Sequence, residues 1–397
     1  MVKIAYITTI PITQWAFLRG QNSFLCNHGF DLHAVSSPGL YLDRLAERDG
    51  VTIHPVPISR RITPLRDLVS LLRLVAVLRR VRPAIAHVST PKAALLGAIA
   101  AWIARVPVRI FLARGLITEG TRGPRRALLR SLERLTARLC HETICVAPSL
   151  LQFARAEGIL KPGRGVVVAR GMSNGIDLGR FDPEAVTPAT LPPGFRPDGG
   201  PIIGFVGRLA RDKGLGDLSE AWSMIRDDYP DARLLIVGAW EEDAPVPPSV
   251  RRAMESDPRV LFVGGQVDVG PYYRCMSMLV FPSHREGFPN APMEAAAMGL
   301  PVIATRVVGC IDAVIDGETG TLVPPHYPVD LAGAIRQYLI DPDLGRRRGR
   351  AGRERVKRDY RQEVIWEALH HEYVRLLAAR SLTAPAGSPR LGRDPGA

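Results

Sequence analysis

Short runs of apolar, often β-branched residues alternate along the chain with longer segments of helical periodicity. In the first half, six such runs predict buried strands, and the segments between them repeat apolar residues every three or four positions, as amphipathic helices do. The predicted strands cover residues 3–10, 31–37, 51–57, 84–89, 106–112 and 142–147. Regular alternation of strand and helix predicts βαβ units and a parallel sheet with helices on both faces.

The alternation stops between residues 179 and 200, where proline and glycine are frequent, and then resumes. Six further runs predict strands over residues 201–207, 232–238, 259–265, 277–283, 301–306 and 319–325. We therefore predict an α/β protein with two doubly wound, Rossmann-like domains, residues 1–178 and 201–360, joined by a linker over 179–200. Ligands bind at the carboxyl ends of such sheets, so the inter-domain cleft is the expected site.

The two ends of the chain and its bulk composition add five expectations. A C-terminal helix is predicted over residues 361–380, where it could pack back toward the N-terminal domain, and residues 381–397 have the composition of a disordered tail. The longest apolar run, Ala93–Ala104, has 12 residues and is too short to span a bilayer. No signal-peptide pattern follows the first residues. Five cysteines without a C-x-x-C pair favour a reducing cytoplasm over a disulfide scaffold or structural zinc.

Charge is distributed unevenly along the chain. Residues 1–180 carry 26 Lys and Arg against 10 Asp and Glu, whereas the remainder carries 26 against 29. Arginines recur every three or four residues among leucines in "TRGPRRALLRSLERLTARLC", with the leucines expected in the core. A basic face of this kind suits peripheral binding to an anionic membrane. Nucleic acid is disfavoured because only 6% of residues are aromatic, too few for a base-stacking platform.

One stretch with candidate chemistry is "FVGRLARDKGLGDL". Gly207 and Arg208 follow a predicted strand, and Lys213 stands at the predicted start of the next helix. Two cations beside the free N–H groups of a helix start favour an anion, and a diphosphate more than a monophosphate. A surface turn with solvated charges is the alternative, since strand-glycine-helix turns are common.

A second stretch, "SHREGFPNAPMEAAAMG", holds two carboxylates on a predicted loop and the helix after it. Glu286 lies in the loop and Glu294 lies one turn inside the helix, among small residues that bring the helix close to its sheet. Carboxylates accept hydrogen bonds from hydroxyls, which suits a ribose and a sugar. Alternatively, Glu294 caps its own helix and Glu286 is solvated, although an acid embedded among small residues has to be paired.

These motifs occur in an order that resembles a known family. "GRLARDKG", the spacing Glu286-x7-Glu294 and "GLPVIATRVVGCIDAVIDGETGTLVPP" together resemble the donor-binding half of family 4 glycosyltransferases, over residues 201–340. In the first domain, "HVSTPKAALLGAIAAWIARVPVRIFLARGL" and "FLRGQNSFLCNHGFDLHAVSSPG" resemble the members that act on polyprenyl-diphosphate-linked precursors of capsule, O-antigen and N-glycans. The resemblance implies GT-B architecture, a nucleotide-sugar donor, a retained anomeric configuration and no metal ion or other cofactor.

The same resemblance implies roles for individual residues. Arg208 and Lys213 would neutralise the donor diphosphate in place of a metal ion, and Glu294 would hold the ribose hydroxyls. Glu286 would position the donor sugar together with Gly287, Phe288, Pro289 and Asn290. The acceptor side would include His87, Arg114, Asn174 and Gly175. The paired glycines common in the family after the first strand are missing; "TTIPITQW" replaces them, with Thr9 and Thr13 as candidate acceptor contacts. The catalytic set is Arg208, Lys213, Glu286 and His87.

Two positions on the acceptor side need comment. Many relatives have a histidine where this chain has Arg114, although the polyprenyl-linked members often have arginine too. His87 is predicted to lie at the end of the fourth strand. A hydrogen-bonded packing residue is the alternative to a catalytic role at that position.

The sequence therefore predicts a retaining glycosyltransferase at the cytoplasmic face of the plasma membrane, which moves a sugar from a UDP-sugar to a lipid-linked hydroxyl. A GDP-sugar donor and a small-molecule acceptor stay open. Two competing hypotheses are a sugar-nucleotide 2-epimerase, which shares the two-domain architecture, and a non-catalytic subunit that binds nucleotide sugars.

Overall fold

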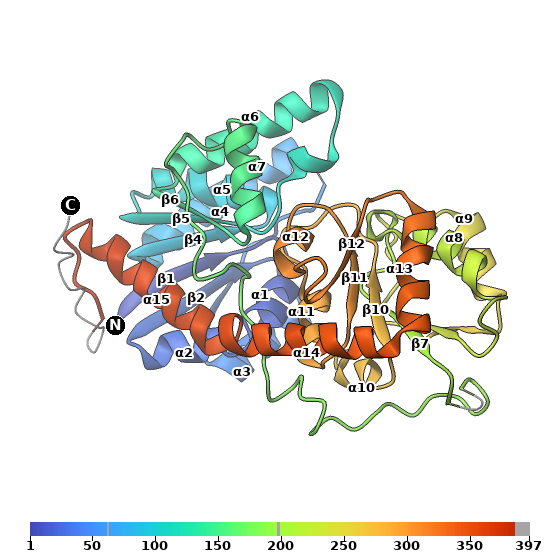
Figure 1. Ribbon diagram of the computed structural model, residues 1–397. Helices are drawn as coiled ribbons and strands as arrows, with labels where there is room; N and C mark the ends of the chain where they lie inside the picture. Colours follow the sequence, from blue (N-terminus) through green and yellow to red (C-terminus); the bar gives the residue numbers. More distant parts are fainter. Residues whose placement is uncertain (62, 197–198, 386–397) are drawn as a thin grey trace. The chain divides into compact units, whose positions relative to one another are not determined.

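The computed structural model describes residues 1–61, 63–196 and 199–385, which form two compact units (Figure 1). Unit 1 consists of Met1–Gly175 and the chain from Gln362 onward, and unit 2 consists of Ile176–Arg361. Residues 179–196 and 199–200, expected to be part of a linker, thus belong to unit 2, which begins two residues before the expected end of the first domain. From residue 386 onward, the predicted tail lies outside the described residues.

Unit 1 is built on a parallel sheet of six strands in the order β3-β2-β1-β4-β5-β6. The strands are β1 (Val2–Ile7), β2 (Phe30–Ser36), β3 (Thr52–Pro55), β4 (Ile85–Ser89), β5 (Val108–Ala113) and β6 (Glu142–Cys145). The helices are α1 (Pro11–Phe17), α2 (Gln21–Asn27), α3 (Leu40–Asp49), α4 (Pro64–Val81), α5 (Pro91–Ile103), η1 (Ile117–Gly120), α6 (Gly123–Leu139), α7 (Pro148–Ala156) and α15 (Gln362–Ala378).

Unit 2 repeats this plan with the order β12-β11-β10-β7-β8-β9. Its strands are β7 (Ile202–Val206), β8 (Arg233–Val237), β9 (Val260–Phe262), β10 (Met278–Phe281), β11 (Val302–Thr305) and β12 (Gly320–Val323). Its helices are η3 (Arg211–Lys213), α8 (Leu215–Ile225), α9 (Pro248–Glu255), α10 (Gly270–Tyr273), α11 (Asn290–Ala297), α12 (Cys310–Ala313), α13 (Pro328–Ile340) and α14 (Pro342–Asp359).

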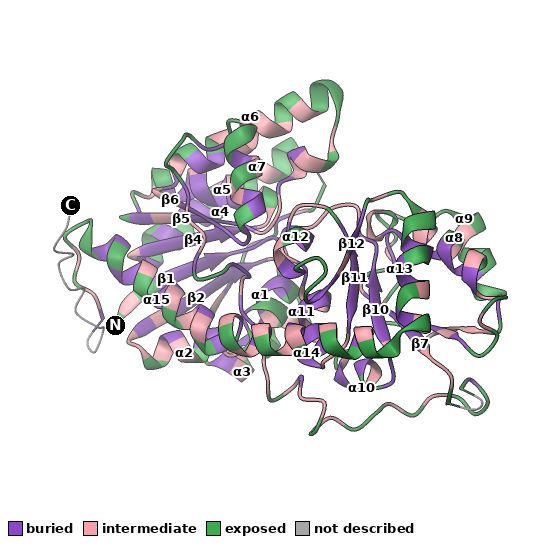
Figure 2. Cartoon of the chain, viewed as in Figure 1, coloured by how far each residue is buried: buried purple, intermediate pink, exposed green. Residues whose placement is uncertain are grey.

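The central strands of each sheet are buried on both faces, as the continuous apolar runs predict (Figure 2). Every residue of β4 and of β7 is buried. Helices cover both faces, so the predicted pair of doubly wound α/β domains is confirmed. In each sheet the strand order reverses once, between β1 and β4 in unit 1 and between β7 and β10 in unit 2. Such a reversal is where α/β sheets bind ligands.

Helix α15 comes last in the sequence but belongs to unit 1. Trp366 of this helix lies so close to the turn between α1 and α2 that a Cβ on Gly20 would stand 2.4 Å from its ring. Gly20 also has φ +78°, so glycine is required there on two grounds. The Tyr373 hydroxyl reaches the sheet, 2.6 Å from that of Tyr6 in β1. Helix α15 therefore completes the core of unit 1.

The prediction for the arginine-rich segment is wrong in one respect. In α6 none of the five leucines is buried, and Leu128 and Leu135 are exposed (Figure 2). Only Thr136 and Ala137 of this helix are buried, because α6 packs mainly against α5 and η1 at the outside of the unit. Among the described residues, no helix combines the length and apolar character required to cross a membrane.

Candidate active site

The reversal point of unit 2 brings together the two stretches singled out in the sequence. Gly207 and Arg208 follow β7, and the loop that carries Glu286 follows β10. Gly214 lets these segments approach, because a Cβ there would stand 1.9 Å from the carbonyl oxygen of Pro282. Its φ of +73° also favours glycine. Lys213 ends the short helix η3, and α8 begins two residues later, so the cation precedes the helix start.

Lys213 and Glu286 form an ion pair in which the Lys213 Nζ donates to Glu286 Oε1. Their side chains are only 14% and 12% exposed, so the two charges depend on each other. Lys213 was predicted to contact the donor diphosphate and Glu286 the donor sugar, but in this structure the two side chains contact each other. Lys213 Nζ also lies 5.7 Å from the centre of the Phe281 ring.

Arg208 is more exposed and has a partner that was not foreseen from the sequence. Its guanidinium donates to Glu241 Oε2 at 2.8 Å, and its side chain is 56% exposed. Glu241 follows β8 in "VGAWEED", where nothing in the local pattern distinguishes it from a solvated acid. An exposed ion pair is worth little, so Arg208 can exchange Glu241 for an anionic ligand at small cost.

The loop after β10 is held from two sides. Asp212 fixes its start, because the carbonyl oxygen accepts the His284 N–H at 2.8 Å and the Ser283 hydroxyl at 3.2 Å. Gly309 contacts its middle, since a Cβ there would stand 2.3 Å from the Gly287 carbonyl oxygen. Phe288 packs on the ring of Tyr360, 5.5 Å between centres. The Gly309 contact is a second feature that was not foreseen from the sequence. The backbone of Gly309, with φ +76°, also favours glycine.

Helix α11 begins at Asn290, directly after Pro289, as expected for this loop. No side chain caps its start and its first turn contains no acid, so its first amide groups are free for a ligand. Glu294 accepts a hydrogen bond at Oε2 from the Tyr273 hydroxyl, at 3.0 Å. Burial raises the pKa of Glu294, and this hydrogen bond and the charge of Arg180 oppose the rise. Glu294 Oε1 accepts no hydrogen bond from the described residues.

In unit 1, His87 is the third of the five residues of β4, not its end, and it is buried. Its Nδ1 lies 2.5 Å from the Tyr373 hydroxyl, and its ring stacks on Tyr6 with centres 4.6 Å apart. Burial, together with the nearby charge of Arg114, lowers the pKa of His87 to about 3. His87 is therefore neutral at physiological pH, and its Nε2 has no hydrogen-bond partner among the described residues.

Arg114 follows β5 and is also unsatisfied. Its Nε and Nη1 are buried without an acceptor among the described residues, and the guanidinium lies 5.1 Å from the centre of the Phe17 ring. Burial lowers the pKa of Arg114 to about 10, so it stays charged at neutral pH. Buried N–H groups without acceptors are costly and rare, so water or a ligand is expected to supply acceptor atoms here.

The other predicted acceptor residues have structural partners. Thr9 donates its backbone N–H to the Thr90 hydroxyl at 3.0 Å, linking the ends of β1 and β4 at the reversal point. Thr13 is buried in α1. Asn174 donates to the Arg19 carbonyl at 3.0 Å and accepts from Trp366 at 2.8 Å. The predicted cleft residues Asn174 and Gly175 thus lie where unit 1 ends, with Asn174 tying α15 to the rest of that unit.

Comparisons with known proteins agree with this arrangement. Residues 200–341 match the family model described as "Glycosyl transferases group 1", and residues 19–171 match that of the "Glycosyl transferase 4-like domain". The capsular polysaccharide biosynthesis glycosyltransferase CapM of Staphylococcus aureus is 32% identical over 376 residues, 94% of this chain and 96% of CapM.

Two further relatives extend the comparison. The UDP-Gal:alpha-D-GlcNAc-diphosphoundecaprenol alpha-1,3-galactosyltransferase of Escherichia coli is 28% identical over 318 residues, 78% of this chain and 80% of that enzyme. The crystal structure of Anabaena HepE with UDP and glucose superposes with a TM-score of 0.74 at 18% identity, over 94% of this chain and all of HepE. The fold is thus the two-domain GT-B fold. The chain belongs to the glycosyltransferase family of these models and is a transferase enzyme.

Proposed function

We propose that this glycosyltransferase binds a UDP-sugar on unit 2 and transfers the sugar, with retention, to a hydroxyl of a lipid-linked saccharide. The observation that carries the donor proposal is the group of Arg208, Lys213 and the uncapped start of α11 at the reversal point of unit 2. Cations and free amides at one point match a diphosphate. The E. coli relative is named for a UDP-sugar and a diphosphoundecaprenol acceptor.

The ion pairs define how the donor is bound. A diphosphate that contacts Lys213 and Arg208 replaces or joins Glu286 and Glu241 as their partners. Glu286, released from Lys213, can then accept hydrogen bonds from sugar hydroxyls, and Glu294 Oε1 can accept from the ribose. The two carboxylates therefore act as acceptors toward one ligand.

The transfer step needs no protein nucleophile. The bond from the anomeric carbon to the β-phosphate oxygen breaks, and a bond from the acceptor oxygen to the same carbon forms on the same face. The acceptor proton passes to the departing diphosphate, whose charge Arg208 and Lys213 stabilise in place of a metal ion. His87 is neutral, and its Nε2 with the Arg114 N–H groups offers unit 1 contacts for acceptor or sugar oxygens.

A panel of UDP- and GDP-sugars tests this proposal, with thermal stabilisation and release of free nucleotide as readouts. We expect stabilisation by UDP over GDP, and UDP release that needs a diphosphate-lipid saccharide and persists in EDTA. Release with water-soluble aglycones alone would favour a small-molecule acceptor. Conversion of the sugar without UDP release would identify an epimerase, and binding without either reaction would identify a non-catalytic subunit.

The acceptor proposal includes docking of unit 1 on an anionic membrane. Along one side of α4 lie exposed apolar residues at helical spacing: Leu65, Leu68, Val69 and Leu72. Arg66, Arg73 and Arg79 on the same helix are exposed as well. An apolar stripe among arginines suits the interface of an anionic bilayer. In α6, by contrast, Arg126 and Arg130 pair with Glu157, which reduces the contribution expected from that helix.

Vesicle sedimentation tests the docking. We expect the triple variant Leu65→Ser, Leu68→Ser and Leu72→Ser to lose most binding to phosphatidylglycerol vesicles, while nucleotide binding persists. A matched control changes two exposed apolar residues of unit 2, Val329→Ser and Ile340→Ser, and should bind as the wild type does. Equal binding by both variants would overturn the role of α4.

A further inference from the structure

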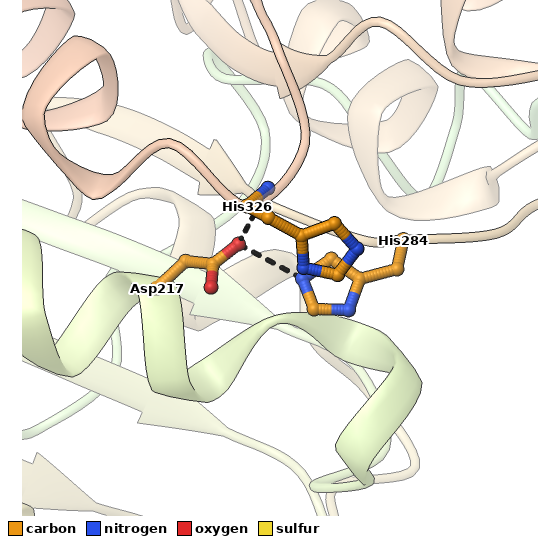
Figure 3. Close-up of side chains that lie close together, drawn as sticks. All are labelled: Asp217, His284 and His326. Carbon is orange, nitrogen blue, oxygen red and sulfur yellow. Dashed lines mark hydrogen bonds and ion pairs between the residues drawn. The ribbon is translucent and has the colours of Figure 1, made fainter.

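A second polar cluster in unit 2 has no part in the proposed sugar transfer. It consists of Asp217, His284 and His326, which come from the first turn of α8, the loop after β10 and the loop after β12 (Figure 3). They are far apart in the sequence, and none of them is assigned a role by the sequence motifs. The fold gathers them at one end of the sheet because all three segments adjoin the carboxyl ends of parallel strands.

The side chains already lie at short range. Asp217 Oδ2 is 2.8 Å from His284 Nε2 and accepts the His326 backbone N–H at 3.1 Å. The two imidazole rings lie against each other (Figure 3), and their centres are 3.8 Å apart. One ligand atom from each residue lies within 4.8 Å of the other two.

We propose that Asp217, His284 and His326 bind a divalent transition-metal ion, with Zn²⁺ as the best match. Two imidazole nitrogens and one carboxylate oxygen are a frequent three-ligand set for zinc, with water in the fourth position. Tetrahedral zinc with bonds of about 2.0 Å needs ligand atoms about 3.3 Å apart. The present separations, 2.8 Å for one pair and at most 4.8 Å for the others, bracket that value. Small side-chain rotations therefore suffice.

A purely structural hydrogen bond accounts for only part of the cluster. The contact of Asp217 with His284 fixes the loop after β10, but it does not explain the imidazole of His326. His326 is exposed and has φ +66°, a left-handed conformation that glycine or asparagine adopts more readily. Its backbone N–H alone would serve the hydrogen bond to Asp217 with any side chain. A metal ion gives the third side chain a function.

The inference goes beyond the proposed function and does not depend on it. The ion would link three segments of unit 2, one of which carries Glu286 two residues after His284. Its expected effect is stabilisation of unit 2 in the absence of any substrate. Sugar transfer itself, as proposed above, uses Arg208 and Lys213 at the diphosphate and no metal ion.

Calorimetric titration of chelator-treated full-length protein with Zn²⁺ tests the site, and Mg²⁺ is the control ion because hard cations prefer oxygen ligands. We expect one Zn²⁺ per chain, no Mg²⁺ binding, and a rise of about 5 °C in the midpoint of thermal unfolding when free Zn²⁺ is a hundredfold above its Kd. Absence of stoichiometric Zn²⁺ binding would overturn the proposal.

Variants separate the metal site from the hydrogen bond. His326→Asn removes the imidazole and tolerates the left-handed backbone, and it should weaken Zn²⁺ binding at least tenfold. His284→Gln can keep a hydrogen bond to Asp217 and should also weaken binding. The matched control is His371→Asn, an exposed histidine of α15 in unit 1, which should bind as the wild type does. Wild-type affinity in His326→Asn, or loss of binding in His371→Asn, would contradict the assignment.

Discussion

Units 1 and 2 share one strand order but treat the charges at their reversal points in opposite ways. In unit 2, Lys213 is paired with Glu286 and Arg208 with Glu241. In unit 1, Arg114 keeps two buried N–H groups without an acceptor, and His87 Nε2 is also unpaired among the described residues. At the reversal point of unit 2 both cations are therefore paired without a ligand, whereas at that of unit 1 buried N–H groups lack an acceptor among the described residues.

The difference has an energetic consequence. An enclosed cation without an acceptor lowers the stability of the free protein, and a ligand that supplies acceptor oxygens recovers the lost free energy on binding. A paired cation contributes stability until a ligand displaces its partner. Removing the cation should therefore have opposite effects on stability in the two units, although both changes impair activity.

The largest effect is expected for Lys213→Met. This change removes the charge that we propose contacts the donor diphosphate, and we expect kcat/KM for transfer to fall about 10²- to 10³-fold. It also leaves Glu286 enclosed without its cation, so the free energy of unfolding should fall by about 3 kcal/mol. Steady-state kinetics and urea unfolding measure the two effects. A kcat/KM close to that of the wild type would refute the proposed role of Lys213 in donor binding.

Arg114→Met is the matching change in unit 1. Transfer should fall about 10- to 100-fold because the contact with an oxygen of the acceptor or sugar is lost. The free energy of unfolding should rise by about 1 kcal/mol, since an unpaired cation leaves the interior. The same kinetics and unfolding curves provide the measurement. A loss of stability similar to that of Lys213→Met would contradict the expected difference between the two units.

Glu294→Gln tests the ribose contact and the pKa of the acid. Affinity for UDP should fall about tenfold, because an amide replaces one of two acceptor oxygens. Burial raises the pKa of Glu294, so the folded state favours the protonated acid, and the wild type should gain stability as the pH falls through that raised pKa toward the ordinary value for glutamate. Glutamine cannot titrate, so thermal unfolding of the variant should lack this gain. UDP affinity equal to that of the wild type would refute the ribose assignment.

The last prediction concerns His87 and affects stability only below neutral pH. Because its pKa is lowered to about 3, the unfolded state takes up a proton first as the pH falls below about 6.5. The wild type should thus lose stability between pH 6.5 and 5, by about 2 kcal/mol from this residue, and no further change from it is expected above pH 7. In His87→Gln this part of the pH dependence should be absent from urea unfolding curves. An unchanged pH dependence would show that His87 takes up a proton as readily in the folded as in the unfolded protein.

Much of the architecture follows from local sequence patterns. Each of the twelve predicted strands has a counterpart in the structure, because a parallel strand buried on both faces requires a continuous apolar run. The start of α11 after Pro289 was predictable for a similar reason, since proline and the small residues after it mark a loop that becomes a helix. The exposure of the leucines in α6 was not predictable, because helical spacing alone does not distinguish a face that packs in the core from one at the surface.

Local patterns along the chain were enough to predict two α/β domains and to single out the residues of the proposed donor site. How the candidate residues pair is visible only in the folded chain: Glu286 with Lys213, Glu294 with Tyr273, His87 with Tyr373. It likewise brought Asp217, His284 and His326 together from three segments. The reason is physical: periodicity reports the neighbours of a residue along one element, whereas partners across a sheet are set by strand order and loop packing.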